Sequence, residues 1–367
     1  IRVFRNTAGT FTEWNPPVTG PTLNSLARPN EATPAQLPGT PKRSDGGSTL
    51  NSLTGWWNGI AAGDFDGDGR MDLVASNWGR NWRTDQAPGG DIPVQLFYGD
   101  FADNGIVQTL LASNDPWLSL VTPWRQRKVV VAAVPAVAER LPNHHAYGRA
   151  GVRQLLGGKA ANARSLEATT FDSMLFLNRG DHFEVRPLPG PAQFAPAFGV
   201  SVADFDGDGN EDVFLAQNCF GLDAETSRQD AGTGLVLLGD GRGGFRALGP
   251  RQAGVAIYGE QRGSAVADFD EDGRPDLVVA QNSGPTRLFR NAQGRPGVRV
   301  VLRGPKQNPS AVGAVVRLSF AERFGPAREI HGGSGHWSQD SAALVLAATT
   351  VPKAIRVQWP GGKAQDW

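Results

Sequence analysis

The sequence predicts an all-β protein: a β-propeller with a helical insertion, followed by a small C-terminal β domain. Three observations lead to this prediction. An acidic turn flanked by apolar runs occurs three times, a second strand-and-turn element occurs five times, and 47 glycines and 26 prolines among 367 residues favour short strands joined by turns. Repeats of roughly 60 residues that hold four short strands are typical of propeller blades, which close into rings of about four to eight.

The acidic turn reads DFDGDGRMD at 64–72, DFDGDGNED at 204–212 and DFDEDGRPD at 268–276. Small and apolar residues precede it, as GIAAG, GVSVA and GSAVA. Runs typical of β-strands follow it, as LVASN, VFLAQN and LVVAQN. Each copy therefore predicts a strand, an acidic loop and a second strand.

The second element is a strand closed by Asn, Asp or Gly, as in a hairpin meander. Its copies are RVFRNTAGTF from Arg2, VQLFYGD from Val94, SMLFLNRGDHF from Ser173, LVLLGDGRGGF from Leu235 and TRLFRNAQG from Thr286. Together the two elements predict about four blades, fewer than many complete rings contain. Because the chain begins inside a strand element, we expect it to be the later part of a longer chain whose first blades lie upstream.

The repeats are unevenly spaced. Asp204 and Asp268 are 64 residues apart, whereas Asp64 and Asp204 are 140 apart, so 76 residues need another explanation. Residues from about 123 to 170 are rich in Leu, Ala, Arg and Gln with few turn signals, which predicts two or three short helices inserted in place of one acidic loop. Residues 16–51, rich in Pro, Thr, Ser, Asn and Gly, predict a long surface excursion.

The acidic loops predict metal sites. Carboxylates this close repel one another by on the order of 1 kcal/mol per pair even in water, and a cation removes that repulsion. Calcium takes six to eight oxygen ligands, and D-x-D-x-D-G supplies side chains at positions one, three and five with a glycine at six. A carbonyl at seven and a carboxylate at nine complete the set. The predicted ligands of about three Ca²⁺ ions are Asp64, Asp66, Asp68, the Arg70 carbonyl and Asp72; Asp204, Asp206, Asp208, the Asn210 carbonyl and Asp212; and Asp268, Asp270, Asp272, the Arg274 carbonyl and Asp276.

Two features separate these loops from an EF-hand: strands flank them, and no glutamate stands at position twelve. The alternative is a set of Asp/Gly turns without metal, and three copies with one spacing favour the metal. Glu271, in place of the glycine of the other copies, makes the third loop the least regular.

The acidic loops resemble the FG-GAP or VCBS repeats of integrin-like β-propellers, in which such loops hold calcium. Residues 308–365 resemble the ASPIC/UnbV domain, through AVGAVVRL, GGSGHWSQDS and IRVQWPGGK. The insertion, followed by ATTFDSMLFLNRG, is similar to bacterial members. The resemblance implies blades over 1–297 and an ASPIC/UnbV-like domain over 298–367. By their pattern alone, VVRLSF, ALVLAA and AIRVQW predict strands, and Trp359–Gly362 predicts a turn.

Composition restricts the partners. With 36 basic and 36 acidic residues, the formal net charge is zero, so nothing predicts a nucleic-acid partner. The single cysteine, Cys219, cannot form a disulfide within the chain. No apolar run is long enough for a transmembrane helix, and the first residues do not read as a signal peptide, so we expect any export signal to lie upstream.

Catalytic motifs are weak. His144, His145 and Tyr147 could transfer protons, but a polar helix junction explains them equally well. Ser334 and Ser338, near His331 and His336, lack the G-x-S-x-G context of a nucleophile.

Other motifs have ordinary explanations too. The glycines around Gly241 lack the lysine of a phosphate-binding loop and predict turns. Trp56, Trp57, Trp78 and Trp82 could stack on sugars or pack under the first acidic loop. Cys219 is expected to end a strand rather than carry redox chemistry.

These observations favour a non-enzymatic, calcium-binding propeller that recognises a protein or carbohydrate from an extracellular, periplasmic or cell-surface location. Calcium would be structural, and recognition would fall to loops and to the insertion. Two alternatives stay open: a polysaccharide-active enzyme that uses the insertion for proton transfer, and an accessory subunit of a larger surface or membrane assembly.

Overall fold

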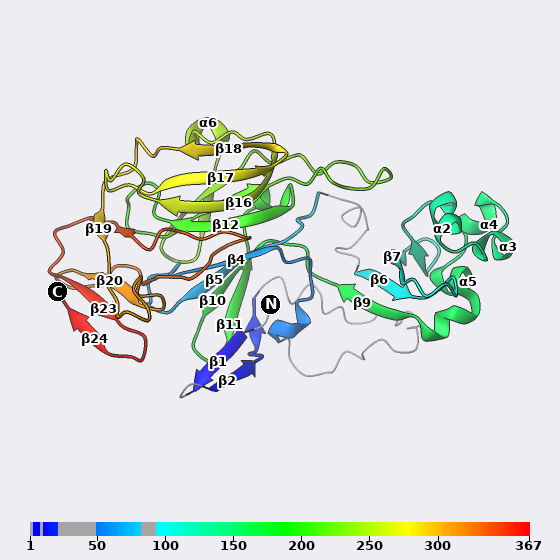
Figure 1. Cartoon of the computed structure of the whole chain (residues 1–367), viewed down its shortest axis with the longest axis horizontal. Helices are drawn as coiled ribbons and strands as arrows, with labels where there is room; N and C mark the ends of the chain where they lie inside the picture. The colour runs from blue at the N-terminus through cyan, green and yellow to red at the C-terminus, as the bar shows by residue number, and fades with distance from the viewer. Residues whose placement is uncertain (1–2, 8–9, 21–48, 82–92) are drawn as a thin grey trace.

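The computed structural model describes residues 3–7, 10–20, 49–81 and 93–367, and strands dominate it (Figure 1). Three sheets carry the acidic turns. The first consists of β4 (Gly59–Gly63), β5 (Asp72–Ser76), β10 (Met174–Asn178), β11 (Phe183–Pro187) and β3 (Val18–Thr19). The second consists of β12 (Ala197–Ala203), β13 (Asp212–Gln217), β14 (Leu235–Gly239) and β15 (Phe245–Leu248), and the third of β16 (Glu260–Ala267), β17 (Asp276–Asn282) and β18 (Gly284–Phe289). The predicted order of strand, acidic loop and strand is confirmed in all three.

The second sheet lies between the other two, and its strand β13 explains why. Val213 and Leu215 pack with Leu175 and Leu177 of the first sheet. The alternate residue Phe214 packs with Leu277 and Val279 of the third sheet, on the other face. Because side chains of a strand alternate between faces, the continuous apolar run of β13 buries both of them.

The first strands of the three sheets approach one another closely, with β12 in contact with both β4 and β16. Small residues permit this approach. A Cβ added at Gly59 would lie 2.2 Å from the Phe198 carbonyl oxygen, and one at Gly199 would lie 2.6 Å from the Arg262 carbonyl oxygen. The small residues before each acidic loop therefore allow these three strands to lie together.

The insertion is larger than predicted and has its own sheet. β6 (Val94–Gly99) was expected to be a blade strand, but it pairs with β7 (Gln108–Asp115) and β9 (Arg164–Ala168), and β7 pairs with β8 (Leu120–Pro123). Four short helices cover this sheet: α2 (Arg127–Ala133), α3 (Val137–Arg140), α4 (His144–Gly148) and α5 (Val152–Leu156), followed by the 3₁₀ turn η3 (Gly157–Asn162). The prediction missed this because blade strands and inserted strands have the same local pattern.

The C-terminal part forms two small sheets around a separate core. β19 (Val298–Val300) pairs with β22 (Leu344–Leu346), while β20 (Val315–Ser319), β21 (Arg328–Glu329), β23 (Ala354–Gln358) and β24 (Ala364–Asp366) form the order β21-β20-β23-β24. The predicted strands and the turn at 359–362 are confirmed, the turn by the bond from the Gly362 amide to the Trp359 carbonyl. These sheets and the helices of the insertion lie at opposite ends of the long axis (Figure 1).

The remaining elements are short. They are the hairpin of β1 (Val3–Thr7) and β2 (Thr10–Trp14), the 3₁₀ turns η1 (Leu50–Ser52) and η4 (Gly190–Gln193), and α6 (Pro250–Ala253). Most of the predicted surface excursion, 21–48, lies outside the described residues. Within the described residues the sheets do not close into a ring, and no helix is both long enough and apolar enough to cross a lipid bilayer.

Candidate metal centres

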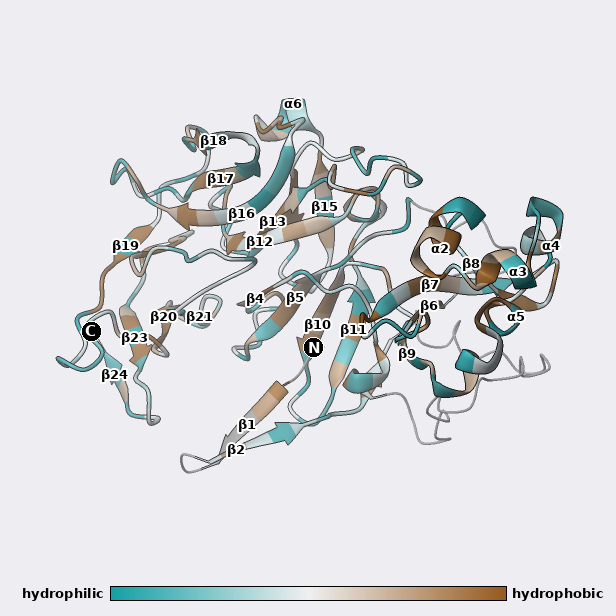
Figure 2. Ribbon diagram, turned by 45° about the vertical axis from the view of Figure 1, so that its right-hand side comes forward, coloured by the Kyte–Doolittle hydropathy of each residue, from teal (hydrophilic) through white to brown (hydrophobic). Residues whose placement is uncertain are grey.

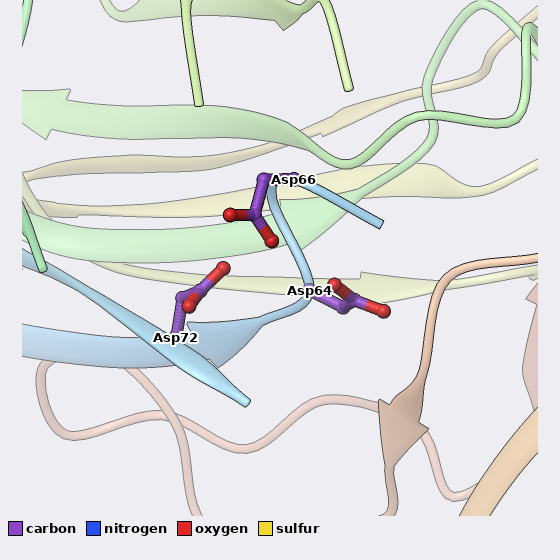
Figure 3. Close-up of side chains that lie close together, drawn as sticks. All are labelled: Asp64, Asp66 and Asp72. Carbon is purple, nitrogen blue, oxygen red and sulfur yellow. The ribbon is translucent and has the colours of Figure 1, made fainter. Parts of the chain in front are cut away.

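Each acidic loop joins the first and second strands of its sheet, and each brings three aspartates together. The first, third and ninth positions converge, so that their ligand atoms lie within 4.8 Å of one another. The three clusters are Asp64, Asp66 and Asp72; Asp204, Asp206 and Asp212; and Asp268, Asp270 and Asp276. In Figure 3 the carboxylates of Asp66 and Asp72 point toward one another, with Asp64 beside them at the start of the loop.

Backbone amides set the shape of each loop. The first aspartate accepts a hydrogen bond from the amide of the glycine at position six, at 3.0 Å in loop 1 (64–72), 2.8 Å in loop 2 (204–212) and 3.2 Å in loop 3 (268–276). These glycines, Gly69, Gly209 and Gly273, have φ of +89°, +96° and +80°, which a residue with a side chain adopts only under strain. The D-x-D-x-D-G pattern therefore closes the loop around its first carboxylate.

The ninth aspartate fastens three strands. In loop 1, Asp72 accepts hydrogen bonds from the Phe65 amide at 3.0 Å and from the Asn178 amide, at the end of β10, at 2.7 Å. The equivalent bonds from Gly239 to Asp212 and from Asn291 to Asp276 are both 2.8 Å. The last carboxylate of each loop thus ties the acidic turn to the third strand of its sheet.

The clusters fit a hard divalent cation. The side chain of Asp64 is buried, as is that of Asp268, and Asp66 is largely covered. One oxygen of each, Oδ1, has no hydrogen-bond partner. A buried carboxylate oxygen without a partner is costly, and carboxylate oxygens are the ligands that calcium and magnesium prefer. Three clusters that could hold metal ions are therefore present.

The aspartates at position five do not join the clusters. Asp68 accepts from the Arg70 amide at 2.8 Å, Asp208 from the Asn210 amide at 2.8 Å, and Asp272 from the Arg274 amide at 3.0 Å. Each closes a local turn of the type that Asp favours, so the D-x-D-x-D spacing also serves the backbone. The roles of these three side chains, and of the Arg70, Asn210 and Arg274 carbonyls, as ligands stay predictions.

The three acidic loops differ in the arginines that pair with their aspartates. In loop 1, Arg179 pairs with Asp66, and Arg317 lies 4.0 Å from Asp64. In loop 3, Arg290 pairs with Asp270, and Arg299 lies 3.5 Å from Asp268.

In loop 2, no arginine of the described chain forms an ion pair with a member of the cluster. The guanidinium of Arg328 pairs instead with the neighbouring Glu211. Within the described residues, loop 2 is therefore the one whose cluster has no direct ion pair with an arginine.

Burial changes the acidity of the clusters. Desolvation raises the pKa of Asp72 to about 7 and that of Asp212 to about 8, against the opposing effect of their backbone hydrogen bonds. Desolvation also raises the pKa of Asp204 to about 6. A bound cation would favour the ionised forms, so metal binding and loss of protons are linked.

This linkage predicts a pH dependence. The folded pKa values of Asp72 and Asp212 lie above the ordinary value of 3.8, so in the metal-free chain their contribution to stability is present below about pH 4 and is lost as the pH rises through 7 and 8. We expect the increase in melting temperature on adding calcium to be larger at pH 8.5 than at pH 5.5, which melts at several pH values would measure. An equal or larger increase at pH 5.5 would contradict this.

Loop 3 carries a strained residue. Glu271 has φ +58°, where the first two loops have Gly67 and Gly207 at +72° and +75°. A left-handed conformation costs a residue with a side chain roughly 1–2 kcal/mol, and the ion pair of the exposed Glu271 with Arg299 offsets only part of this. We expect Glu271→Gly to raise the free energy of unfolding by about 1 kcal/mol in urea denaturation.

Gly67→Ala is the matched control, because a Cβ there meets nothing within 4 Å and only the backbone conformation is tested. It should lower stability by about the same amount. Destabilisation by Glu271→Gly would show that the ion pair outweighs the strain.

A C-terminal segment, residues 326–341, lies along the first strands of all three sheets. The Ala327 amide donates to Asp64 Oδ2 at 2.8 Å. The Gly335 amide donates to the Ile60 carbonyl at 2.9 Å, and Asp340 accepts from the Val266 amide at 2.7 Å. We call residues 326–341 the central segment. It connects the C-terminal sheets to the aspartate clusters.

The other candidate residues have structural roles. His336 Nδ1 lies 3.0 Å from the Asn58 carbonyl oxygen, and Ser338 Oγ donates to the Ser334 carbonyl at 3.0 Å. These contacts hold the turn of the central segment. His144 and His145 are exposed on α4, at the far end of the molecule from the acidic loops, whereas the Tyr147 hydroxyl donates to the Arg125 carbonyl.

The tryptophans pack at the other end of β5 from loop 1, which corrects the expectation that they lie beneath it. Trp56 meets Trp78 edge to face at 5.1 Å and Phe171 at 5.9 Å, where the inserted sheet begins. Trp56 and Trp57 line a cavity of about 550 Å³. Trp82 lies outside the described residues.

Cys219 and Gly241 lie at a strand end and in a turn, as their sequence context predicts. Cys219 is a buried free thiol whose backbone pairs with Gln229 just after β13, and burial raises its pKa. Gly241 lies in the turn between β14 and β15 with φ +66°, as its turn signal predicts.

Comparison with known proteins adds a family for the C-terminal sheets. Residues 304–367 match the model of the family described as "ASPIC and UnbV". Residues 304–367 form an ASPIC/UnbV domain. The central segment, which contacts the first aspartate cluster through Ala327 and Asp64, is therefore part of the ASPIC/UnbV domain.

Two curated relatives match more of the chain. Cartilage acidic protein 1 of Homo sapiens and that of Mus musculus are each 28% identical over 201 residues, which is 52% of this chain. The match covers only 29% and 30% of their own lengths. Among solved structures, the exotype rhamnogalacturonan lyase YesX aligns with 100% of this chain and 62% of its own, at 14% identity and with a TM-score of 0.22.

Proposed function

We propose that this chain is a calcium-binding recognition module that works in the extracellular space, the periplasm or at a cell surface. It would bind a protein or carbohydrate partner and act as a scaffold rather than as a catalyst. Three carboxylate clusters, each at the same turn of a sheet, carry the proposal. Affinities of about 10⁻⁴ to 10⁻³ M, typical of extracellular calcium modules, would fill such sites outside a cell and leave them mostly empty in cytosol.

We further propose that residues 1–297 form FG-GAP/VCBS-type blades of the bacterial kind and residues 298–367 the ASPIC/UnbV-like domain. The packing of the three sheets through their first strands, and the acidic loops on those strands, support a propeller-like arrangement. In this proposal calcium neutralises each loop, and the position-nine aspartates hold the third strand of each sheet in register.

The test is thermal unfolding of the whole chain with about 2–5 mM calcium and after chelation. Calcium should raise the melting temperature, and Asp64→Asn, Asp204→Asn and Asp268→Asn should each remove part of that increase. The largest loss is expected for Asp204→Asn, because no arginine of the described residues forms a direct ion pair with the cluster of loop 2 and competes with the ion there. Equal melting temperatures with and without calcium would refute the proposal.

Asp240→Asn is the matched control. Asp240 accepts backbone hydrogen bonds in the turn between β14 and β15, outside the three clusters. Its replacement should lower the melting temperature with and without calcium alike and leave the calcium-dependent increase unchanged. A loss of that increase in this variant would show that the calcium effect is not specific to the clusters.

A further inference from the structure

The helical part of the insertion carries a positive charge that the whole-chain total hides, whereas the inserted strands and their turns add four acidic residues, Asp100, Asp103, Asp115 and Glu167. Residues 123–166, which we call the basic lobe, contain eight of the 36 Lys and Arg residues and one of the 36 acidic residues, Glu139. The lobe therefore has a formal charge of +7, and the rest of the chain has −7. Such an asymmetry within a neutral chain indicates an anionic partner for one part of it.

Four exposed cations of the lobe form no ion pair within the described residues. Lys128, Arg140, Arg149 and Arg164 are exposed, and none forms an ion pair with a residue that the structure describes. By contrast, the arginines beside the acidic loops are paired with aspartates. Arg125 and Lys159 of the lobe pair with Asp223 and Asp103, so it is these four cations that stay available to a partner outside the chain.

The lobe holds these cations on a packed scaffold rather than a tail. Val137, Leu155 and Leu156 of its helices are fully buried in a core shared with Phe97 and Leu110 of the inserted sheet. The Arg140 Nε donates to the Leu155 carbonyl at 3.1 Å, which fixes the side chain while leaving its terminal nitrogens available. The mostly hydrophilic helix α4 forms the outer edge of the lobe (Figure 2).

An exposed tryptophan adjoins this surface. Trp117 is 87% exposed at the tip of the hairpin of β7 and β8, in a turn where Asp115 Oδ1 accepts from the Trp117 amide at 2.9 Å. That hairpin contacts the start of α5, where a Cβ on Gly151 would lie 3.5 Å from the Leu120 Cβ. Trp117 is three residues from Leu120, and Arg149 is two residues from Gly151, so the two residues lie on chain segments that are in contact.

We propose that the basic lobe and Trp117 bind an acidic polysaccharide, which deepens the recognition role proposed above and rests on it. Arg149, Arg140 and Lys128 would pair with carboxylate or sulfate groups, for which the guanidinium fork is suited. Trp117 would stack on the apolar face of a sugar ring. Val129 and Leu166 are the large apolar side chains exposed on the described lobe, and two separate side chains do not form the broad apolar face with which an amphipathic helix binds a bilayer.

Binding of the calcium-loaded whole chain to a heparin octasaccharide and to a galacturonate octamer, by calorimetry in about 150 mM salt, tests this. At least one of the two anionic oligosaccharides should bind, and a neutral maltose octamer should not. The variant with Lys128→Gln, Arg140→Gln and Arg149→Gln should weaken binding at least tenfold, and Trp117→Ala at least threefold. Arg251→Gln with Arg287→Gln, two exposed arginines outside the lobe, should leave it unchanged.

Several results would overturn the inference. These are binding of neither anionic glycan, binding that survives the lobe variants or Trp117→Ala, and preference for single-stranded DNA or for phosphatidylserine vesicles over both glycans. Calcium melts of the same preparations keep the two proposals separable. Loss of glycan binding with an intact calcium effect concerns the lobe alone, whereas glycan binding without a calcium effect overturns the metal sites alone.

Discussion

Replacement of Arg328 by methionine should lower the free energy of unfolding by about 3–5 kcal/mol, because it leaves Glu211 as a buried charge without its partner. Both side chains are largely buried, and the guanidinium holds both carboxylate oxygens, at 2.7 and 2.6 Å. Arg328 belongs to the central segment and Glu211 to loop 2. Replacement of Arg328 therefore also removes a link between the C-terminal domain and the loop that carries the second aspartate cluster. Urea denaturation followed by tryptophan fluorescence measures the effect.

Two further variants make this prediction specific. Arg328→Met combined with Glu211→Gln should recover much of the loss, because the charge of Glu211 is then removed together with its partner. Arg356→Met is the exposed control: Arg356 makes the same two-bond contact with Asp366, at 2.8 and 2.9 Å, but at the surface, so its replacement should cost much less than that of Arg328. Similar losses for Arg328→Met and Arg356→Met would contradict the role assigned to the buried pair.

Gly335→Ala should displace the central segment. Gly335 has φ +61°, and a Cβ there would lie 2.5 Å from the Val200 carbonyl oxygen and 3.0 Å from its nitrogen. The strained backbone and the clash together should cost about 2 kcal/mol or more and break the pairing with Ile60. Limited proteolysis should then cut the chain near 331–341 faster than in the unmodified protein.

Gly333→Ala is the control for this effect, since the nearest atom to an added Cβ there is 3.9 Å away and its φ is not left-handed. It should be cut at the rate of the unmodified chain. If Gly335→Ala is cut no faster than Gly333→Ala, the central segment is held by contacts other than the Gly335–Ile60 pairing.

The acidic loops could be predicted from sequence because their chemistry is local. Within nine residues, the alternate aspartates and the glycine at position six fix the turn, and apolar runs such as that of β13 fix the flanking strands. Which aspartates converge was only partly predictable. Asp68, Asp208 and Asp272 have the spacing of ligands, but their carboxylates bond to backbone amides of their own turns.

Long-range features could not be read in the same way. β6 has the pattern of a blade strand, and only its pairing with β9 reveals that it belongs to the insertion. The pairing of Gly335 with Ile60 and the pair of Arg328 with Glu211 join segments with no shared sequence pattern. The charge of the basic lobe was present in the sequence, but a whole-chain total of zero concealed it.

The central segment also constrains the order of events during synthesis. Ile60 and Asp64 leave the ribosome well before their partners Gly335 and Ala327, and Asp64 and Ala327 are 263 residues apart. Until then the first strands stay uncovered beside one another, and closing so long a loop is slow. A nascent chain of this protein therefore completes the contacts of loop 1 only after residues 327–335 have emerged, and an ion bound at loop 1 before then would neutralise Asp64 in the absence of the Ala327 amide.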